Sequence, residues 1–303
     1  MSRTRELIAA LRRDLGEADP APPAIHVERV PDPPVRVFPS RRERSRLAGE
    51  ASAHTTALVG IGRVGTRYAT SVVLQFQAEL AVAHAAVGQV LPDGWAEEQG
   101  LIGLSSQVRD HREFLLRPDL GRRLDEASVA RLAEDDVPKG VDVQPILADG
   151  LSAVACMGSG VELLEAFSEA CRARGLTVGA PLCARFARVW LQDPIGAAVG
   201  AKVAAILLGE RPGLGTGDGL SAYLVFDPKP GNTDGDRNMM SNIHHRGTPP
   251  AEAAPRLADL AAAMIAQGRS GVDLDLSGVA GVESGLRPPQ VRLPLVETGG
   301  DLS

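Results

Sequence analysis

Two glycine-rich segments, each with a carboxylate, are the clearest candidates for a binding site. Asp149–Ser152 (DGLS) and Gly209–Gly215 (GERPGLG) each follow an apolar run that is typical of a buried strand. Ligands bind at the carboxyl ends of the strands in open parallel sheets, and glycine lets the backbone approach them closely. Asp149 and Glu210 would then accept hydrogen bonds from a ligand. The structural alternatives are that Asp149 caps the next helix and that Glu210 pairs with Arg211 or caps a helix.

A histidine pair lies further along the chain, in the segment Asn242–Gly247 (NIHHRG). Adjacent histidines suggest a metal site, and some cofactor-binding proteins donate a histidine to a metal from a loop with similar spacing. However, Asn242 stands where an acidic residue would orient such a ligand. One histidine pair without a wider acidic or histidine cluster is also a poor metal site. We therefore interpret His244 as part of a structural loop that precedes a helix.

No familiar nucleotide fingerprint or catalytic set accompanies these segments. GERPGLG does not match G-x-x-x-x-G-K-[ST], and no G-x-G-x-x-G opens a helix after the first strand of the α/β region. Gly60–Gly65 (GIGRVG) fits a glycine pattern loosely but lies outside any βαβ unit. Neither a Ser-His-Asp, a Cys-His nor a paired-carboxylate constellation stands out. Ligand-type loops without a catalytic set favour a chain that helps to hold a cofactor.

Composition excludes several classes of protein. The chain has 303 residues, of which 44% are hydrophobic, so it can bury a core. Its 32 basic and 38 acidic residues give a net charge of −6, which argues against nucleic-acid binding through a basic face. No run approaches the roughly 20 apolar residues of a membrane span. The three cysteines lack C-x-x-C spacing, which indicates reduced thiols, no zinc site and a cytoplasmic protein.

The elements that would position the glycine-rich segments alternate between strand and helix. Strands are predicted at 141–147, 184–191, 202–208 and 220–226, and helices at 161–174 and 249–267. Gly175 would end the first of these helices in the left-handed conformation. This alternation predicts an α/β fold with a doubly wound, parallel, Rossmann-like sheet. Residues 55–135 carry helical patterns, chiefly over 70–90, and no convincing strand.

We divide the chain into five segments on this basis. They are an amphipathic helix (1–19), a Pro/Arg-rich linker (20–50), a small all-α domain (51–138), the Rossmann-like domain (139–272) and a disordered tail (273–303). The linker assignment rests on seven prolines between residues 20 and 39, which favour extended chain over helix.

Six motifs in order resemble the small (light) subunit of ethanolamine ammonia-lyase. Besides DGLS and GERPGLG, they are GRVGTR at 62–67, RPDLGRRL at 117–124, AKV at 201–203, and SNIH at 241–244 with GTPP at 247–250. Each motif alone is weak, but the six keep the family's order and spacing over about residues 55–272.

The resemblance implies an enzyme of large and small subunits, commonly six of each. In that family the large subunit is a barrel that binds ethanolamine and carries the catalytic residues. Adenosylcobalamin lies between that barrel and the small subunit's Rossmann-like domain. Homolysis of its cobalt–carbon bond starts the radical rearrangement of ethanolamine to acetaldehyde and ammonia. The cofactor keeps its own base on cobalt (the base-on form), so His244 would not be a metal ligand. Because the large subunit carries the catalytic residues, this chain would carry none.

The family's cofactor contacts fall on three residues of this chain. The resemblance places them at Val189, Glu210 and Met239. Met239 stands where a family member has cysteine, so contact by packing would survive the change but a role of the thiol would not. Ala69 stands where an arginine is found, which would alter the subunit interface if that arginine touches the partner.

Other functions stay open at this point. In some family members an N-terminal helix and linker direct the enzyme into a protein-shelled bacterial microcompartment, and residues 1–19 could do so here. The chain could instead be a stand-alone Rossmann-like enzyme that uses a nucleotide or S-adenosylmethionine. It could also be a scaffold protein of a microcompartment. We expect neither nucleic acid nor a membrane as a partner.

Overall fold

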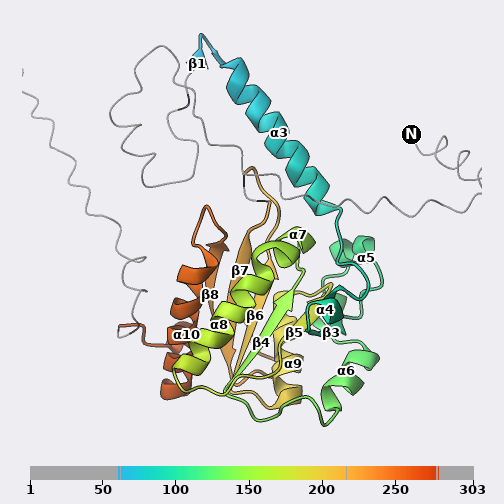
Figure 1. Ribbon diagram of the computed structural model, residues 1–303, viewed down its shortest axis with the longest axis vertical. Helices are drawn as coiled ribbons and strands as arrows, with labels where there is room; N and C mark the ends of the chain where they lie inside the picture. The colour runs from blue at the N-terminus through green and yellow to red at the C-terminus, as the bar shows by residue number, and fades with distance from the viewer. Residues whose placement is uncertain (1–60, 62, 216, 278, 280–303) are drawn as a thin grey trace, which may run out of the picture.

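The computed structural model describes residues 61, 63–215, 217–277 and 279 (Figure 1). The predicted N-terminal helix (1–19) and linker (20–50) lie outside the described residues, as does most of the predicted tail. A short 3-10 turn, Gly271–Asp273, overlaps the first residue of that tail. None of the helices in the described ranges is both long and apolar enough to cross a membrane.

A mixed sheet of six strands, in the order β3-β5-β4-β6-β7-β8, organises the chain. The strands are β3 (Ile102–Ser105), β4 (Val143–Ala148), β5 (Leu182–Arg185), β6 (Val203–Gly209), β7 (Leu220–Phe226) and β8 (Arg237–Ile243). The first four in spatial order are parallel, whereas β7 is antiparallel to both β6 and β8. The carboxyl ends of β5, β4, β6 and β8 therefore meet at one edge of the sheet.

Helices cover both faces of this sheet. Helix α8 (Val161–Ala173) and helix α10 (Pro250–Gln267) pack side by side across one face (Figure 1). Helix α6 (Glu126–Ala133) and helix α9 (Gln192–Val199) pack on the other. The remaining helices and hairpin strands are β1 (Arg63–Val64), β2 (Arg67–Tyr68), α3 (Thr70–Val87), α4 (Trp95–Glu98), α5 (His111–Leu116) and α7 (Ala153–Ala155).

The sequence of β6 explains its central position. Its side chains alternate between the two cores, with Val203 and Leu207 on the α8/α10 face and Ile206 on the α6/α9 face. All three are fully buried. A strand covered on both faces reads as a continuous apolar run, as this one does.

The predicted doubly wound parallel sheet is correct only in part, because β7 is antiparallel. Among residues 210–215 and 217–219, which join β6 to β7, no helix begins. A parallel strand needs a crossover of a dozen or more residues, usually with a helix, so this short connection can only turn the chain back. The same edge gains β8, a strand that we did not predict.

Two further predictions are corrected. Residues 51–138 are not all helical, since β3 lies within them and pairs with β5. The strand predicted at 184–191 is β5 at Leu182–Arg185 and ends earlier. Phe186 has φ of 52°, in the left-handed region, and this turns the chain out of the sheet. The helices at 161–174 and 249–267 are confirmed, as is the left-handed Gly175 with φ of 76°.

Candidate cofactor-binding site

The two glycine-rich segments meet at the carboxyl edge of the sheet. The Leu151 amide donates a hydrogen bond to the Gly209 carbonyl oxygen at 2.9 Å. The Ser152 hydroxyl donates to the Gly217 carbonyl oxygen at 3.1 Å. A Cβ atom at Gly150 would collide with the Gly209 carbonyl oxygen, and the φ of Gly150 is 54°. Glycine is therefore required where the segments cross.

Asp149 stabilises the turn that follows β5 at this edge of the sheet. Its carboxylate is buried and accepts hydrogen bonds from the amides of Phe186 (2.8 Å) and Ala187 (3.2 Å). The residue that caps the following helix is Ser152, whose hydroxyl accepts a hydrogen bond from the Ala155 amide, so the structural alternative for Asp149, a helix cap, does not hold. Burial raises the pKa of Asp149 to about 6, against the opposing effect of these hydrogen bonds. Asp149 thus fixes the turn that leads from β5 to Val189.

Glu210 lies just beyond the end of β6. Its amide donates to the Gly219 carbonyl oxygen at 2.9 Å, and the Ser221 hydroxyl donates to its carboxylate. Neither structural alternative for Glu210 holds among the described residues, since no helix begins after it and no ion pair joins it to Arg211. The partly exposed carboxylate keeps capacity to accept further hydrogen bonds.

The three residues assigned by resemblance share one face of the sheet. Val189 packs against the α6/α9 core. Glu210 lies two residues after Leu208, which packs on the same face, and side chains two apart along a strand point the same way. Met239 pairs directly with Tyr223 and Tyr223 with Ile206, so Met239 is also on this face.

This face is open in part, at the middle of β7 and β8. Met239 is 50% exposed, and Tyr223 is half-buried. On the opposite face of β7, Leu220, Ala222 and Leu224 are fully buried. The backbone of Glu210 pairs with Gly219, and Met239 pairs with Tyr223, four residues further along β7. At about 3.3 Å per residue, a ligand that touches both would extend roughly 13 Å along the sheet.

Comparison with known families shows which family the chain belongs to. The family model of the ethanolamine ammonia-lyase light chain (EutC) matches residues 47–275. The chain belongs to this family. The matched range contains the whole sheet and the segments that carry all three assigned residues. Membership of a light-chain family implies a larger partner chain.

The histidine loop of the light chain is built as a structural element. His244 is buried, and its Nε2 lies 2.7 Å from the Asn242 side-chain oxygen. The Arg246 amide donates to its Nδ1 at 3.2 Å, so the ring proton is on Nε2. His245 Nε2 lies 3.6 Å from a carboxylate oxygen of Glu162. Within the described part of the chain, no group of three or more His, Cys, Asp or Glu could hold a metal ion.

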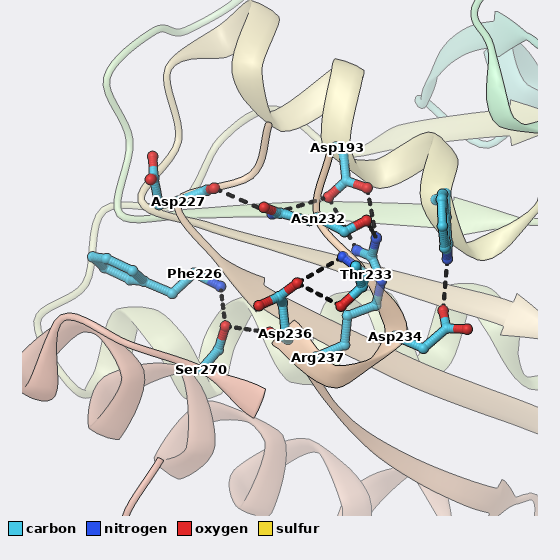
Figure 2. Close-up of polar contacts among 10 residues, drawn as sticks. Asp193, Phe226, Asp227, Asn232, Thr233, Asp234, Asp236, Arg237 and Ser270 are labelled. Carbon is cyan, nitrogen blue, oxygen red and sulfur yellow. Dashed lines mark hydrogen bonds and ion pairs between the residues drawn. The ribbon is translucent and has the colours of Figure 1, made fainter. Parts of the chain in front are cut away.

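Sequence reasoning missed a buried ion pair that fixes the open face. Arg237, the first residue of β8, donates to both carboxylate oxygens of Asp193, at 3.0 and 2.6 Å (Figure 2). Their side chains are only 2% and 4% exposed. Burial raises the pKa of Asp193, and the Arg237 charge opposes that shift. The pair joins β8 to the first turn of α9, next to the 3-10 turn Val189–Leu191, so it sets the spacing between Val189 and Met239.

Proposed function

We propose that this chain is the light subunit of an adenosylcobalamin-dependent ethanolamine ammonia-lyase and holds the cofactor against the large subunit. One observation carries the proposal. The two glycine-rich segments meet beside an open sheet face that presents Val189, Glu210 and Met239. The family match supports the enzyme and the partner. It argues against a stand-alone nucleotide enzyme.

The residues present fit a base-on corrinoid. Such a cofactor combines a broad apolar ring with amide side chains. The Glu210 carboxylate can accept hydrogen bonds from the N–H groups of these amides. Val189 and the exposed thioether chain of Met239 offer apolar contact. Met239 does so by packing, without the thiol that a family member carries there. Both ring nitrogens of His244 already contact their own loop, which agrees with a cofactor that brings its own base.

The roles of the two chains differ. When bound, adenosylcobalamin supplies a radical by homolysis of its cobalt–carbon bond, and this starts the conversion of ethanolamine to acetaldehyde and ammonia. The light chain binds and orients the cofactor, while the large subunit, with commonly six copies of each chain, holds ethanolamine and the catalytic residues. We further propose a cytoplasmic assembly, which residues 1–19 would direct into a microcompartment where the host makes a shell.

Changing Glu210 to alanine is expected to weaken adenosylcobalamin binding several-fold. Because solvent screens this partly exposed carboxylate, one lost hydrogen bond to a neutral amide is worth about 0.5–1.5 kcal/mol. The measurement is an absorbance titration of the co-purified two-subunit complex with the cofactor. Glu210→Gln, which keeps an acceptor oxygen, should lose less.

A matched control is Glu169→Ala, which changes an exposed glutamate on α8, across the opposite face. It should leave the cofactor affinity unchanged. If Glu210→Ala and Glu169→Ala bind adenosylcobalamin as tightly as the unaltered complex does, the carboxylate makes no contact with the cofactor and the proposed site is wrong.

A further inference from the structure

Three arginines converge beside the proposed cofactor site from separate parts of the chain. Arg122 ends a 3-10 turn, Arg188 precedes Val189, and Arg211 follows Glu210. The Arg188 amide donates to the Gly121 carbonyl oxygen at 2.8 Å, which places it next to Arg122. The Arg122 guanidinium carbon lies 4.7 Å from the ring centre of Trp190, two residues after Arg188.

Arg188 is held by contacts with Phe114, but one of its donors has no hydrogen-bond partner among the described residues. Its guanidinium carbon lies 4.0 Å from the centre of the Phe114 ring, and one terminal nitrogen donates to the Phe114 carbonyl oxygen at 2.8 Å. Its Nε is buried and has no hydrogen-bond partner among the described residues. A buried donor without a partner is unfavourable, and such groups call for a ligand or water.

The cluster is also short of negative charge. Burial, and then the charges of Arg122 and Arg211, lower the pKa of Arg188 against the smaller opposing effect of the Asp149 charge. Two carboxylates close to the cluster in sequence or space already bind other groups, since Asp149 accepts hydrogen bonds from backbone amides and Glu210 from Ser221. Neither forms an ion pair with these arginines in the described part of the chain. Three like charges held close together are stable when an anion lies between them.

We propose that Arg122, Arg188 and Arg211 bind a phosphodiester, that of the nucleotide loop of the corrinoid. Guanidinium groups present paired donors that match the oxygens of a phosphate. The nucleotide loop carries the one phosphate of a base-on corrinoid, and the cluster adjoins both Val189 and Glu210. This inference rests on the proposed function and adds an anion subsite to it.

The test uses corrinoids that differ in this group. The co-purified complex and its Arg122→Gln, Arg211→Gln and doubly substituted forms are titrated by absorbance with three ligands. These are adenosylcobalamin, adenosylcobinamide, which lacks the phosphate and the base, and adenosylcobinamide phosphate, which lacks only the nucleoside. Both substituted arginines are exposed, so the fold should tolerate the changes.

Each single substitution should raise the Kd for adenosylcobalamin and for adenosylcobinamide phosphate by about tenfold, the usual value of a charge-assisted hydrogen bond. The Kd for adenosylcobinamide should not change. Arg172→Gln, an exposed change on α8, should alter none of the three constants. An equal loss of affinity for all three ligands would overturn the proposal.

Failure of the substituted chains to co-purify would overturn it as well, because the arginines would then face an acidic surface of the large subunit. A distinct outcome is that the unaltered complex binds none of the corrinoids. That result would refute the proposed function itself, and the inference with it.

Discussion

Changing Asp193 to alanine is expected to lower the free energy of unfolding by about 3–5 kcal/mol, because it leaves the buried Arg237 charge uncompensated. Arg237 donates two hydrogen bonds to Asp193, and both side chains are almost fully buried. Its guanidinium carbon also lies 5.7 Å from the Trp190 ring centre, so the loss should shift tryptophan fluorescence. Urea unfolding of the full-length chain, followed by circular dichroism, measures the effect.

The double substitution Asp193→Leu with Arg237→Met distinguishes the cost of an unpaired buried charge from the loss of side-chain packing at this position. Replacing both partners by apolar side chains of similar size removes the buried charges together, so most of the stability should return. The exposed pair between Arg117 and Asp119 is the control. Asp119→Ala should change stability little. An effect of Asp193→Ala as small as that of Asp119→Ala would show that the buried pair does not hold β8 to α9.

Changing Gly209 to alanine is expected to weaken corrinoid binding by about tenfold or more and to lower the free energy of unfolding by about 1–3 kcal/mol. A Cβ atom there would collide with the carbonyl oxygens of Ser152 and Asp149. Both are backbone atoms, so relief requires the DGLS segment to move away from β6. The hydrogen bond from Leu151 to Gly209 would break with that movement. Absorbance titration of the two-subunit complex and urea unfolding measure the two effects.

Gly217→Ala is the matched control in the same connection between β6 and β7. A Cβ atom at Gly217 would lie 3.7 Å from Val82 Cγ1, which is ordinary contact. This variant should bind the corrinoid and unfold much as the unaltered chain does. Equal behaviour of the two alanine variants would mean that the close crossing of the glycine-rich segments is unimportant for binding.

The core of the fold could be predicted because its elements carry local signals. The run at 202–208 is apolar throughout, as a doubly covered strand must be, and β6 is found there. Helix α8 shows both its apolar face and its left-handed glycine cap. The meeting of the two glycine-rich segments followed from topology, because segments after adjacent parallel strands must lie at one edge of the sheet.

The elements that were missed lack such signals. Strand β3 has four residues, one of them glycine, and β8 (RNMMSNI) mixes polar and apolar side chains without the regular alternation that predicts a strand. The early end of β5 depends on Phe186, whose left-handed backbone is held by Asp149, 37 positions away in sequence. The ion pair between Asp193 and Arg237 is equally non-local. The reversal at β7 did have a signal, namely the absence of a helical pattern after residue 209.

We propose above that this chain works as the cofactor-holding subunit of ethanolamine ammonia-lyase. The most direct measurement is co-expression with the large subunit, with an affinity tag on this chain only. We expect both chains to elute together and to release ammonia from ethanolamine only after adenosylcobalamin is added. Elution of this chain alone would contradict the proposed assembly. Elution of both chains without cofactor-dependent ammonia release would contradict the proposed reaction.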